Sequence, residues 1–571
     1  MNIGSPFAEL AAQFPAFGTA LVRHAAGDLE GARALYLPLL EQPRLTSACL
    51  HQLASLAVAR GELALAADLL QHALRLEPSQ LPSHSLLANT LWRLGQGAAG
   101  LAVLLEQGCA LQLAERFADA EIPYREILQH DPLNYGAHVN LGTCLAQQQR
   151  LAEATQHMLL ALRLYGRLNR NVLDFALGLQ QRLRVQLGLA LDAALPEGPP
   201  HGRIEKIEDA ITTLGKLMSE QGLPEEALRC HRLSVALAPG FALGHWNLAL
   251  ALLALRDYAL GWQKYEWRWH WPGFPAARRQ RDLPLWTGQP LAGKRLLVWA
   301  EQGFGDTLQF APLLQRLGNR GAQITWEVAA PLQRLLAHSL PGVRVLPAQD
   351  PQAAPPGGPY DFGVAQLSLP ALLHMETQPL PWATRYLHAD AEASARWAQL
   401  LGARTQPRVG IAWNGRAQPN ARRSVPFDTL APLLARRQVR WISLQVGDAQ
   451  HDIPTAGPQA LLNPADGLQD FADTAALMTQ LDLVITIDSA VAHLAGALGV
   501  PTWLMLLPVP DWRWQDSQPD ADGHECSRWY PQVRLFRQER DTGWAAVVQA
   551  LGLALDAALQ AQALQGPTPP L

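Results

Sequence analysis

The spacing of apolar positions changes twice between residues 481 and 507. Residues 483–487 form an apolar, mostly β-branched run without a breaker, which is typical of a strand buried on both faces. Residues 490–498 show helical spacing with small residues along one face, and a second apolar run follows at 502–507. Strand, tight turn, small-faced helix and strand together predict a βαβ unit of a parallel sheet, around which the second half of the chain is organised.

Polar residues stand at the turn of this unit, where the first strand ends and the helix begins. Asp488 and Ser489 follow the strand directly, and His493 lies one helical turn later. Free backbone N–H groups and the helix dipole at such a turn favour a bound phosphate. Taken singly, Asp488 or Ser489 fits a helix cap equally well, and His493 fits a surface histidine. Taken together, the three residues favour a ligand site.

Residues 1–275 are rich in Leu and Ala and poor in β-branched residues, a helical composition. Small residues recur with a period of about 34 residues, in frames that begin at Gln13 and Ser47 and resume at Gly108. A fragment at 81–100 breaks the register, and an insertion at about 169–207 includes a loop-like P-E-G-P-P-H. The pattern resembles tetratricopeptide repeats, which implies an α-solenoid with a concave groove. Such grooves bind extended peptide or protein; the alternative is that the array only stabilises or dimerises the second half.

Tryptophans crowd the sequence between 261 and 290, where the repeats give way to a connector at 276–291. We interpret them as large apolar anchors that pack the last repeat onto the next domain. The alternative is a surface that stacks bases or sugars.

Beyond the connector, short apolar strands alternate with helical runs and loops, which predicts two doubly wound halves at 292–390 and 391–556. The expected strands are 294–300, 323–328, 343–346, 361–364, 408–413, 439–445, 481–487 and 501–507. Two Rossmann-like domains in tandem face a cleft at the carboxyl ends of their strands. No G-x-G-x-x-G opens a helix after a strand and no P-loop Lys is present, which argues against dinucleotide oxidoreductases and kinases. Residues 557–571 are expected to be a disordered tail.

Composition narrows the class of protein further. A net charge of −4 argues against a general nucleic-acid binder and against a polybasic membrane anchor. Five scattered cysteines without a C-x-x-C pair suggest reduced thiols. The first residues lack the features of a secretory signal, and no run of 18 apolar residues occurs, so we expect a cytoplasmic protein without a membrane span.

Four motifs carry a further resemblance: E-Q-G-F-G-D at 301–306, N-G-R-A-Q-P-N-A-R-R-S-V-P-F at 414–427, D-S-A-V-A-H-L-A-G-A-L-G-V-P at 488–501, and D-W-R-W at 511–514. They resemble glycosyltransferase family 9, the heptosyltransferase-like group with the GT-B fold, over about residues 262–550. The fusion to tetratricopeptide repeats resembles many bacterial proteins. Its architecture is similar to that of O-linked N-acetylglucosamine transferases and flagellin glycosyltransferases.

The resemblance implies roles for individual residues. The Asp of the G-x-G-D turn, here Asp306, corresponds to the family's proposed catalytic base, although a helix N-cap is an alternative role for it. Around Asp306, the acceptor side would comprise Glu301, Gln302, Gly303 and Gly305, with Glu301 either a rival base or a structural partner. The segment that grips the donor diphosphate corresponds to Asp488, Ser489 and His493, with Ala490 in place of the usual Gly and less space for a phosphate.

Positive groups for the departing phosphate come from the loop at 414–427 and from the helix after Asp488. The family's phosphate-contacting Lys is absent, but Arg416, Arg422 and Arg423 stand in that loop, and Arg is a good bidentate phosphate partner. We expect Arg416, Arg423, a positively charged His493 and the helix N-terminus at Ser489 to stabilise the leaving group.

With these positive groups in place we expect neither a metal nor another cofactor. The D-x-D at 520–522 is interpreted as a solvated loop.

The resemblance therefore implies a metal-independent, inverting glycosyltransferase that moves a sugar from a nucleotide sugar to a protein docked in the repeat groove. One alternative keeps the chemistry but makes it a heptosyltransferase-like enzyme of glycan or lipopolysaccharide assembly. Another is a repeat scaffold with an inactive transferase domain. Homo-oligomerisation through the repeats is open in all three.

Overall fold

The computed structural model describes residues 7–188, 197–200, 206–274, 283–348, 357–375, 385–416, 420–453, 461–540 and 542–565. The chain divides into two compact units, Met1–Leu217 and Met218–Leu571. The division falls inside helix α12 (Ile207–Glu220), so the helices that follow α12 belong to the same unit as the sheets.

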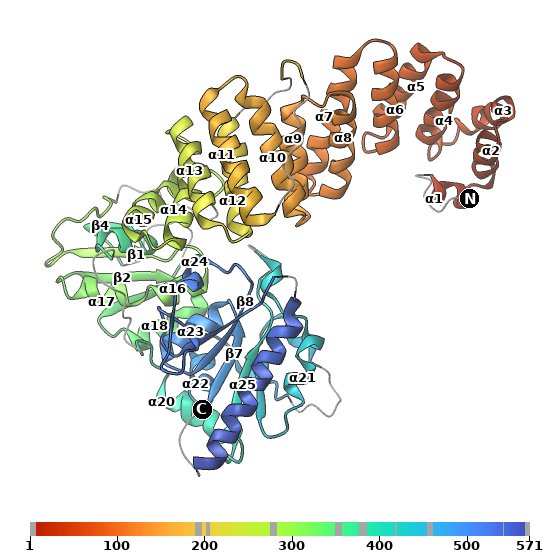
Figure 1. The fold of residues 1–571 in the computed structure, drawn as a ribbon. Coiled ribbons are helices and arrows are strands. Elements are labelled where there is room, and N and C mark those ends of the chain that lie inside the picture. Colours follow the sequence, from red (N-terminus) through yellow and green to blue (C-terminus); the bar gives the residue numbers. More distant parts are fainter. Residues whose placement is uncertain are drawn as a thin grey trace. The chain divides into compact units, whose positions relative to one another are not determined.

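The first unit is built of helices that pack side by side in chain order (Figure 1). They are α1 (Ala8–Gln13), α2 (Pro15–Ala25), α3 (Leu29–Leu39), α4 (Thr46–Ala59), α5 (Leu63–Leu76), α6 (Leu81–Arg93), α7 (Gly97–Leu113), α8 (Phe117–His130), α9 (Tyr135–Gln147), α10 (Leu151–Gly166) and α11 (Arg170–Leu187).

Small residues stand where these helices cross, as the repeat pattern predicts. Ala54, Ala66, Ala120 and Ala154 are fully buried. A Cβ added to Gly108 would lie 2.6 Å from the ring of Tyr124, so only glycine lets α7 and α8 approach this closely.

The two irregular places in the repeat pattern are largely helical. The fragment at 81–100 forms α6, which packs against both α5 and α7 and keeps the stack continuous. The insertion at 169–207 begins with helix α11, which packs on α10. Residues 197–200 have no helix or strand, in agreement with the predicted loop, and the rest of the insertion between 189 and 205 lies outside the described residues.

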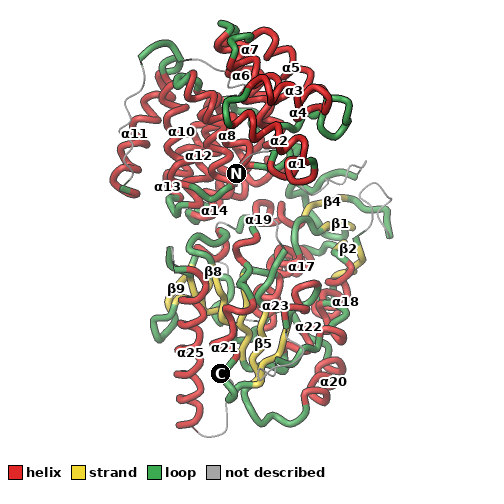
Figure 2. The backbone as a smooth tube through the Cα atoms, turned by 90° about the vertical axis from the view of Figure 1, so that its right-hand side faces the viewer, coloured by secondary structure: helices red, strands yellow, loops and turns green. Residues whose placement is uncertain are grey.

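The second unit opens with the last repeat helices and continues into the sheets. The helices are α13 (Pro224–Leu237), α14 (Ala242–Ala254), α15 (Tyr258–Tyr265) and the 3-10 turn η1 (Glu266–His270). Figure 2 shows helices up to this point and strands only after it, among the residues drawn in colour.

Within the second unit, the first Rossmann-like half contains a four-stranded parallel sheet in the order β3-β2-β1-β4. Its strands are β1 (Arg295–Trp299), β2 (Gln323–Val328), β3 (Val343–Pro347) and β4 (Phe362–Ala365), and its helical segments are α16 (Phe304–Gln309), α17 (Pro312–Gly318), α18 (Ala330–Ser339), η2 (Gln366–Ser368) and α19 (Leu369–Leu372).

The second half contains a seven-stranded sheet in the order β6-β5-β7-β8-β11-β10-β9. The parallel strands are β5 (Arg408–Ala412), β6 (Arg440–Ser443), β7 (Leu483–Ile487), β8 (Thr502–Leu506) and β11 (Val533–Arg537). An antiparallel hairpin of β9 (Ser517–Pro519) and β10 (Glu525–Ser527) extends one edge. The helices are α20 (Ala391–Leu401), α21 (Ala431–Leu434), α22 (Phe471–Met478), α23 (Ala490–Leu498), α24 (Trp512–Gln515) and α25 (Gly543–Gln565), with short 3-10 turns η3 (Ala421–Arg423), η4 (Phe427–Leu430), η5 (Asp448–Asp452) and η6 (Ala465–Gly467).

All eight expected strands are present, and the fold class is confirmed: a tetratricopeptide-type α-solenoid followed by two Rossmann-like halves of the GT-B type. The strand β11 and the β9–β10 hairpin were not expected. The prediction of a disordered tail from residue 557 is wrong for residues 557–565, which continue helix α25. Residues 566–571 lie outside the described residues.

Two tryptophans of this region, Trp262 and Trp286, pack as interdomain anchors. Trp262 is buried, and its ring lies edge-on to Phe310 at 5.7 Å and to Trp512 at 5.6 Å between centroids. Trp286 is buried and its backbone N–H donates to Gly363 of β4 at 2.9 Å. One continuous apolar core therefore runs from α14 through the first sheet to α23 and α24.

Helix α25 is the one helix among the described residues that is long and apolar enough to cross a membrane, over Gly543–Ala561. It packs against α21, η4 and β11, and its Val547, Leu551 and Leu555 are buried. The Arg436 guanidinium pairs with Asp556 on the same helix at 2.7 Å. The core helix of a soluble domain has the same length and composition, so this helix alone is weak evidence for a membrane span.

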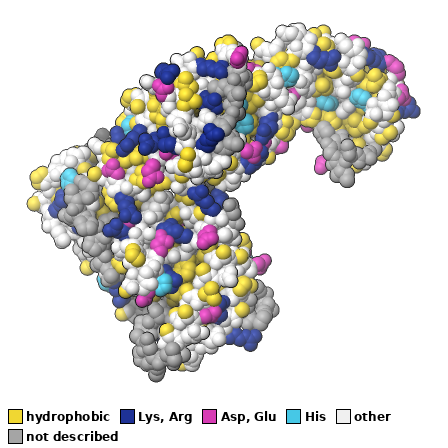
Figure 3. Space-filling view, in the orientation of Figure 1, with side chains coloured by type: hydrophobic (Ala, Val, Ile, Leu, Met, Phe, Trp, Pro, Cys, Tyr) yellow, Lys and Arg dark blue, Asp and Glu magenta, His cyan; other side chains and the backbone are white. Residues whose placement is uncertain are grey.

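On the face drawn in Figure 3, Lys and Arg side chains are interspersed with Asp and Glu.

Candidate active site

Two strand-to-helix turns, one from each half, lie in direct contact. The G-F-G-D turn follows β1 and opens α16, and the D-S turn follows β7 and opens α23. A Cβ added to Gly305 would lie only 2.7 Å from Cδ2 of His493, so α16 and α23 can meet here only because this residue is glycine. The structure thus brings the predicted acceptor-side motif and the predicted donor-side motif together.

Asp306 is held at both carboxylate oxygens. The backbone N–H of Gly303, the N-cap residue of α16, donates to its Oδ2 at 3.0 Å, so Asp306 caps the helix from the N3 position and is not the N-cap itself. The Arg513 guanidinium donates to its Oδ1 and forms an ion pair with it. Burial raises the pKa of the Asp306 carboxyl, and Arg513 opposes that rise. The cap role and a charged partner are therefore both present, and the role of catalytic base stays a prediction.

Arg513 contacts Asp306 directly, and the sequence did not single it out. It lies on α24, within the D-W-R-W motif, and it is 9% exposed. Its Nε donates to Oε1 of Gln309 at 2.8 Å and its Nη1 to Oδ1 of Asp511 at 2.8 Å. An Arg between two Trp is the signal in the sequence that points to a buried, fixed cation.

Glu301 has the geometry of a structural partner. It is 5% exposed, and Arg268 of η1 donates to its two oxygens at 2.9 and 2.8 Å. The backbone N–H of Leu367 adds a third bond at 3.1 Å. Burial raises the pKa of Glu301, and Arg268 opposes the rise. With its oxygens occupied in this way, Glu301 is poorly placed to act as the rival base.

Gln302 has an unusual backbone conformation, with φ of 68°, which a non-glycine residue rarely adopts. Its side chain is exposed, and Nε2 donates to the Tyr265 hydroxyl at 2.7 Å. The last repeat helix thus fixes the residue that precedes the G-F-G-D turn.

On the donor side, Asp488 accepts a hydrogen bond from the Trp514 indole N–H at 2.8 Å. Burial, together with the nearby charge of Asp511, raises the pKa of Asp488 to about 6, while Arg423 and Arg513 oppose the rise. Ser489 occupies the N-cap position of α23 without making a side-chain cap bond, and Ala490 is the first residue of the helix. The Ser489 Oγ is buried and has no hydrogen-bond partner in the described part of the chain.

The two predicted arginines lie in the loop after β5. The Arg416 guanidinium is 5.3 Å from the ring centroid of Phe304, so it reaches from the second half to the G-F-G-D turn of the first. Arg423 donates from Nη2 to the backbone oxygen of Arg416 at 3.2 Å. The Arg423 Nε is buried and, among the described residues, has no partner. Ser489 Oγ and Arg423 Nε are therefore buried donors left open on the donor side.

His493 lies at the junction of the halves but differs from the prediction in its charge. It is 5% exposed, its Nδ1 lies 3.1 Å from the Tyr530 hydroxyl, and its ring packs on Trp514 at 5.0 Å. Burial, with Arg513 nearby, lowers the pKa of His493 to about 3. The expectation of a positive charge at His493 is therefore wrong, because the imidazole is neutral at neutral pH.

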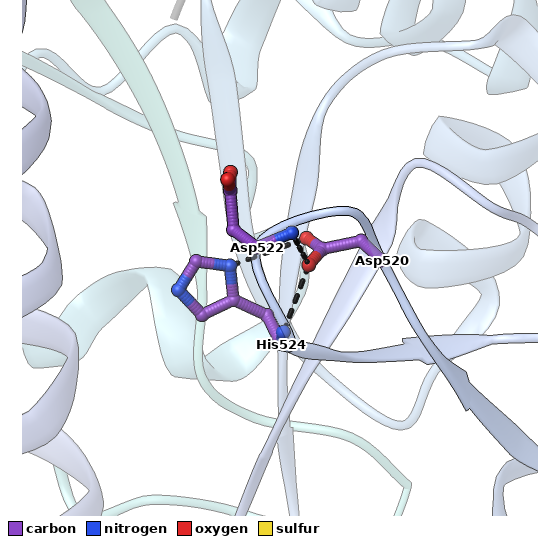
Figure 4. Close-up of side chains that lie close together, drawn as sticks. All are labelled: Asp520, Asp522 and His524. Carbon is purple, nitrogen blue, oxygen red and sulfur yellow. Dashed lines mark hydrogen bonds and ion pairs between the residues drawn. The ribbon is translucent and has the colours of Figure 1, made fainter.

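Asp520, Asp522 and His524 cluster at the turn between β9 and β10, with potential ligand atoms within 4.8 Å of one another (Figure 4). Oδ1 of Asp520 accepts from the backbone N–H groups of Asp522 and His524 at 2.9 and 2.8 Å, and its Oδ2 lies 3.2 Å from Nδ1 of His524. These contacts close the turn on itself, and Asp520 and Asp522 are exposed, as the interpretation of a solvated loop predicts. We assign the trio a structural role in the hairpin.

Comparison with known proteins finds a sequence relative and solved structures of glycosyltransferases. No family model matches it. It is 29% identical to Protein FlbA of Caulobacter vibrioides over 372 residues, which is 61% of this chain and 59% of that protein. The chain thus matches well under two thirds of the length of this relative.

Two solved structures are similar at low identity. A glycosyl transferase family 9 protein from Veillonella parvula is 14% identical, with a TM-score of 0.36, over 48% of this chain and all of that one. The iron-containing dodecameric glycosyltransferase TibC from enterotoxigenic Escherichia coli is 16% identical, with a TM-score of 0.32, over 48% of this chain and 78% of that one.

Proposed function

We propose that this protein is a glycosyltransferase that moves a sugar from a nucleotide-sugar donor to an acceptor hydroxyl. The observation that carries the proposal is the contact of the two turns. It sets the carboxylate of Asp306 on one side of the junction, and the N-terminus of α23 with the buried, open donors of Ser489 and Arg423 on the other. Ligands of doubly wound sheets bind at such strand ends.

The reaction proceeds as a single displacement at the anomeric carbon. The acceptor hydroxyl gives its proton to Asp306 as its oxygen forms the new bond to that carbon. The bond from the anomeric carbon to the phosphate oxygen breaks, and the electron pair leaves with the nucleotide. Attack opposite the leaving group inverts the anomeric centre.

Negative charge builds up on the departing phosphate, and this chain offers groups to stabilise it. Arg423, Arg416 and the backbone N–H groups at the start of α23 supply positive potential, and Ser489 Oγ supplies a hydrogen-bond donor. His493 is neutral and can contribute only a hydrogen bond. These groups perform the task that a divalent cation performs in other transferases, so we propose a reaction without metal or cofactor.

We propose further that the acceptor is a protein held by the helical array. The first unit is a stack of paired helices, and stacks of this type offer an extended surface to a bound chain. We place the protein in the cytoplasm. None of the five cysteines, all of which lie in the described residues, forms a disulfide bond, and four of them are buried, which is consistent with a reducing compartment.

A thermal-shift screen with UDP-, GDP-, ADP- and CMP-sugars tests the donor class. A nucleotide sugar at 100 times its dissociation constant should stabilise the protein by about 2.7 kcal/mol. Hydrolysis of the stabilising sugar nucleotide without acceptor then tests for chemistry. Stabilisation without any turnover would support the inactive scaffold, and no stabilisation by any of the four classes would contradict the proposed function.

A further inference from the structure

Arg513 spans the junction between the two halves. It belongs to α24 of the second half, yet two of its partners, Asp306 and Gln309, lie on α16 of the first. Its guanidinium is also 4.5 Å from the ring centroid of Trp512, so one face of the group is covered. This arginine is largely buried and is fixed by four neighbours.

We propose that Arg513 is the positioning residue for Asp306, orienting the carboxylate across the junction and keeping it ionised so that it can accept the proton of the acceptor. The inference rests on the proposed function, since it concerns the residue proposed there as the base. It adds a requirement: the base is complete only when α24 of the second half lies against α16 of the first.

The geometry explains why the orientation is specific. The fork of Arg513 is anchored behind by Asp511, which caps α24 by accepting from the Arg513 backbone N–H at 3.1 Å. Gln309, one helical turn after Asp306, holds Nε at 2.8 Å. The remaining guanidinium nitrogen therefore points at Oδ1 of Asp306, while Gly303 holds Oδ2. Both torsions of the carboxylate are fixed before any substrate arrives.

The groups that face Asp306 come from several elements. α24 contributes Arg513 and Asp511, α15 contributes Tyr265, the segment before β11 contributes Tyr530, and α23 contributes His493 through its contact with Gly305. Burial raises the pKa of both tyrosines and lowers that of His493, so all three are neutral near pH 7. Arg513 is the cation of this set, and its positive charge is balanced against the negative charge of Asp511.

Removal of the Arg513 cation should change the pKa of Asp306 in a definite direction. An opposite charge beside a carboxylate lowers its pKa by about 1–3 units, so the pKa of Asp306 rises when Arg513 is replaced by a neutral residue. Asp306 acts in its ionised form. The acid limb of the pH profile must therefore move to higher pH.

The test is the pH profile of nucleotide-sugar hydrolysis by the full-length protein, with whichever UDP-, GDP-, ADP- or CMP-sugar stabilises it most. In Arg513→Met the acid limb should move up by about 1–3 pH units. In Arg513→Lys, which keeps a cation but loses the fork, the acid limb should stay in place, and kcat should fall about tenfold or more at an unchanged KM.

The matched control is Arg334→Gln. Arg334 of α18 also pairs across the halves, with Asp470 at 2.9 and 2.7 Å, but it touches none of the site residues. It should lower the melting temperature and leave the acid limb unmoved. If Arg513→Met does not fold, the Arg513→Lys comparison decides by itself.

The outcomes separate the two proposals. If the wild type turns over, three results would overturn the role of Arg513 alone. They are an unmoved acid limb in Arg513→Met, an equal shift of the acid limb in Arg334→Gln, and a change of KM without a change of kcat in Arg513→Lys. Absence of turnover by the wild type would overturn the proposed function and this inference with it.

Discussion

At the scale of single residues, Asp306 combines two contacts that have different consequences. Its carboxylate accepts the hydrogen bond from the Gly303 N–H that caps the helix, and the amide oxygen of an asparagine can accept this bond as well. Its ion pair with Arg513, in contrast, requires a negative charge on residue 306. Asp306→Asn should therefore keep nucleotide-sugar affinity while turnover falls by roughly 10²–10⁴-fold, because the amide cannot accept the proton. Steady-state kinetics and a thermal-shift titration of the same variant check this.

Loss of the ion pair also lowers the stability of Asp306→Asn, so the comparison needs a variant that is destabilised in a similar way. Arg334→Gln breaks an ion pair between the same two halves and reports how much turnover instability alone removes. Normal turnover in Asp306→Asn would reduce Asp306 to a cap and partner of Arg513. Glu301, enclosed by Arg268, is not a ready substitute.

Arg423 offers a second prediction at this scale. Its Nε is buried without a partner in the described residues, and its Nη2 already holds the backbone of Arg416. Arg423→Ala should weaken nucleotide-sugar binding about tenfold or more, and Arg423→Lys should weaken it less, because charge is kept and only the bidentate fork is lost. Isothermal titration calorimetry measures both.

Arg437→Ala is the matched control for Arg423. It also removes an arginine from the second half, but Arg437 is exposed and lies ahead of β6, near the amino end of that strand, and the strand ends proposed to bind the donor are the carboxyl ends. Equal losses in Arg423→Ala and Arg437→Ala would indicate a general effect of charge, against a specific phosphate contact.

Asp488 should make the empty protein less stable as the pH rises. Its pKa is about 6 in the folded state, above the ordinary value of 3.8, so the folded protein binds more protons than the unfolded chain between these values. Stability is therefore lost as the pH rises toward and through 6. Asp488→Asn should raise the melting temperature clearly at pH 7.5 and much less at pH 4.5.

The exposed Asp448 provides the control, since Asp448→Asn should change the melting temperature little and equally at both pH values. A gain for Asp488→Asn that is the same at pH 4.5 and pH 7.5 would show that packing, and not the buried charge, is responsible.

At the scale of elements, the approach of α16 to α23 depends on one missing side chain. A Cβ on Gly305 would meet the His493 ring at 2.7 Å, and that ring is packed between Trp514 and Tyr530. Gly305→Ala should therefore destabilise the protein by about 1–3 kcal/mol and lower turnover, because the two turns must move apart. Chemical denaturation and kinetics give the two numbers.

Gly318→Ala is the control, because it makes the same substitution at a glycine where an added Cβ has room. At the end of α17 the nearest atom to an added Cβ is 4.0 Å away, so alanine fits and should stabilise the helix slightly. If both variants lose the same stability, the contact between the turns is not what makes Gly305 necessary.

The elements also show what the sequence could and could not predict. The strand β7 and the helix α23 were predictable because a β-branched run followed by a small-faced helix has little other meaning. Helix α25 was predicted too short, because the tail prediction rested on the Pro-rich G-P-T-P-P-L at 566–571 and was extended over residues 557–565, whose Ala and Leu favour a helix.

The site was predictable only in part, since its decisive contacts join residues far apart in the chain. The resemblance named both turns, but it could not show that Gly305 faces His493 or that Arg513 reaches Asp306. Likewise, the buried surroundings that make His493 neutral come from Trp514 and Tyr530, which no local pattern relates to it.

At the scale of the whole molecule, the repeats and the sheets are expected to have separable tasks. Deleting residues 1–206, up to the start of α12, should leave nucleotide-sugar binding nearly intact and abolish modification of the native protein acceptor. The cut removes most of the first unit and keeps α12 and the helices of the second. Thermal shift with the sugar nucleotide and a transfer assay on the acceptor test the two parts.

If the shortened protein also loses nucleotide-sugar binding, the first unit supports the donor site. Full modification of the acceptor would show that the array is not where the acceptor docks. Either result would contradict the proposed division of tasks.

The buried pair of Arg268 and Glu301 also limits how proteins of this design can exchange parts. Arg268 lies in η1, after the last repeat helices, and is fully buried against Glu301, two residues after β1. Tyr258 of α15 donates a hydrogen bond to Asp516, the residue that follows α24. A recombination breakpoint between the last repeat and the first strand would separate Glu301 from Arg268 and Asp516 from Tyr258. Breakpoints ahead of α12 spare both contacts, so the early repeats can be exchanged between such proteins while the last ones are inherited with the sheets.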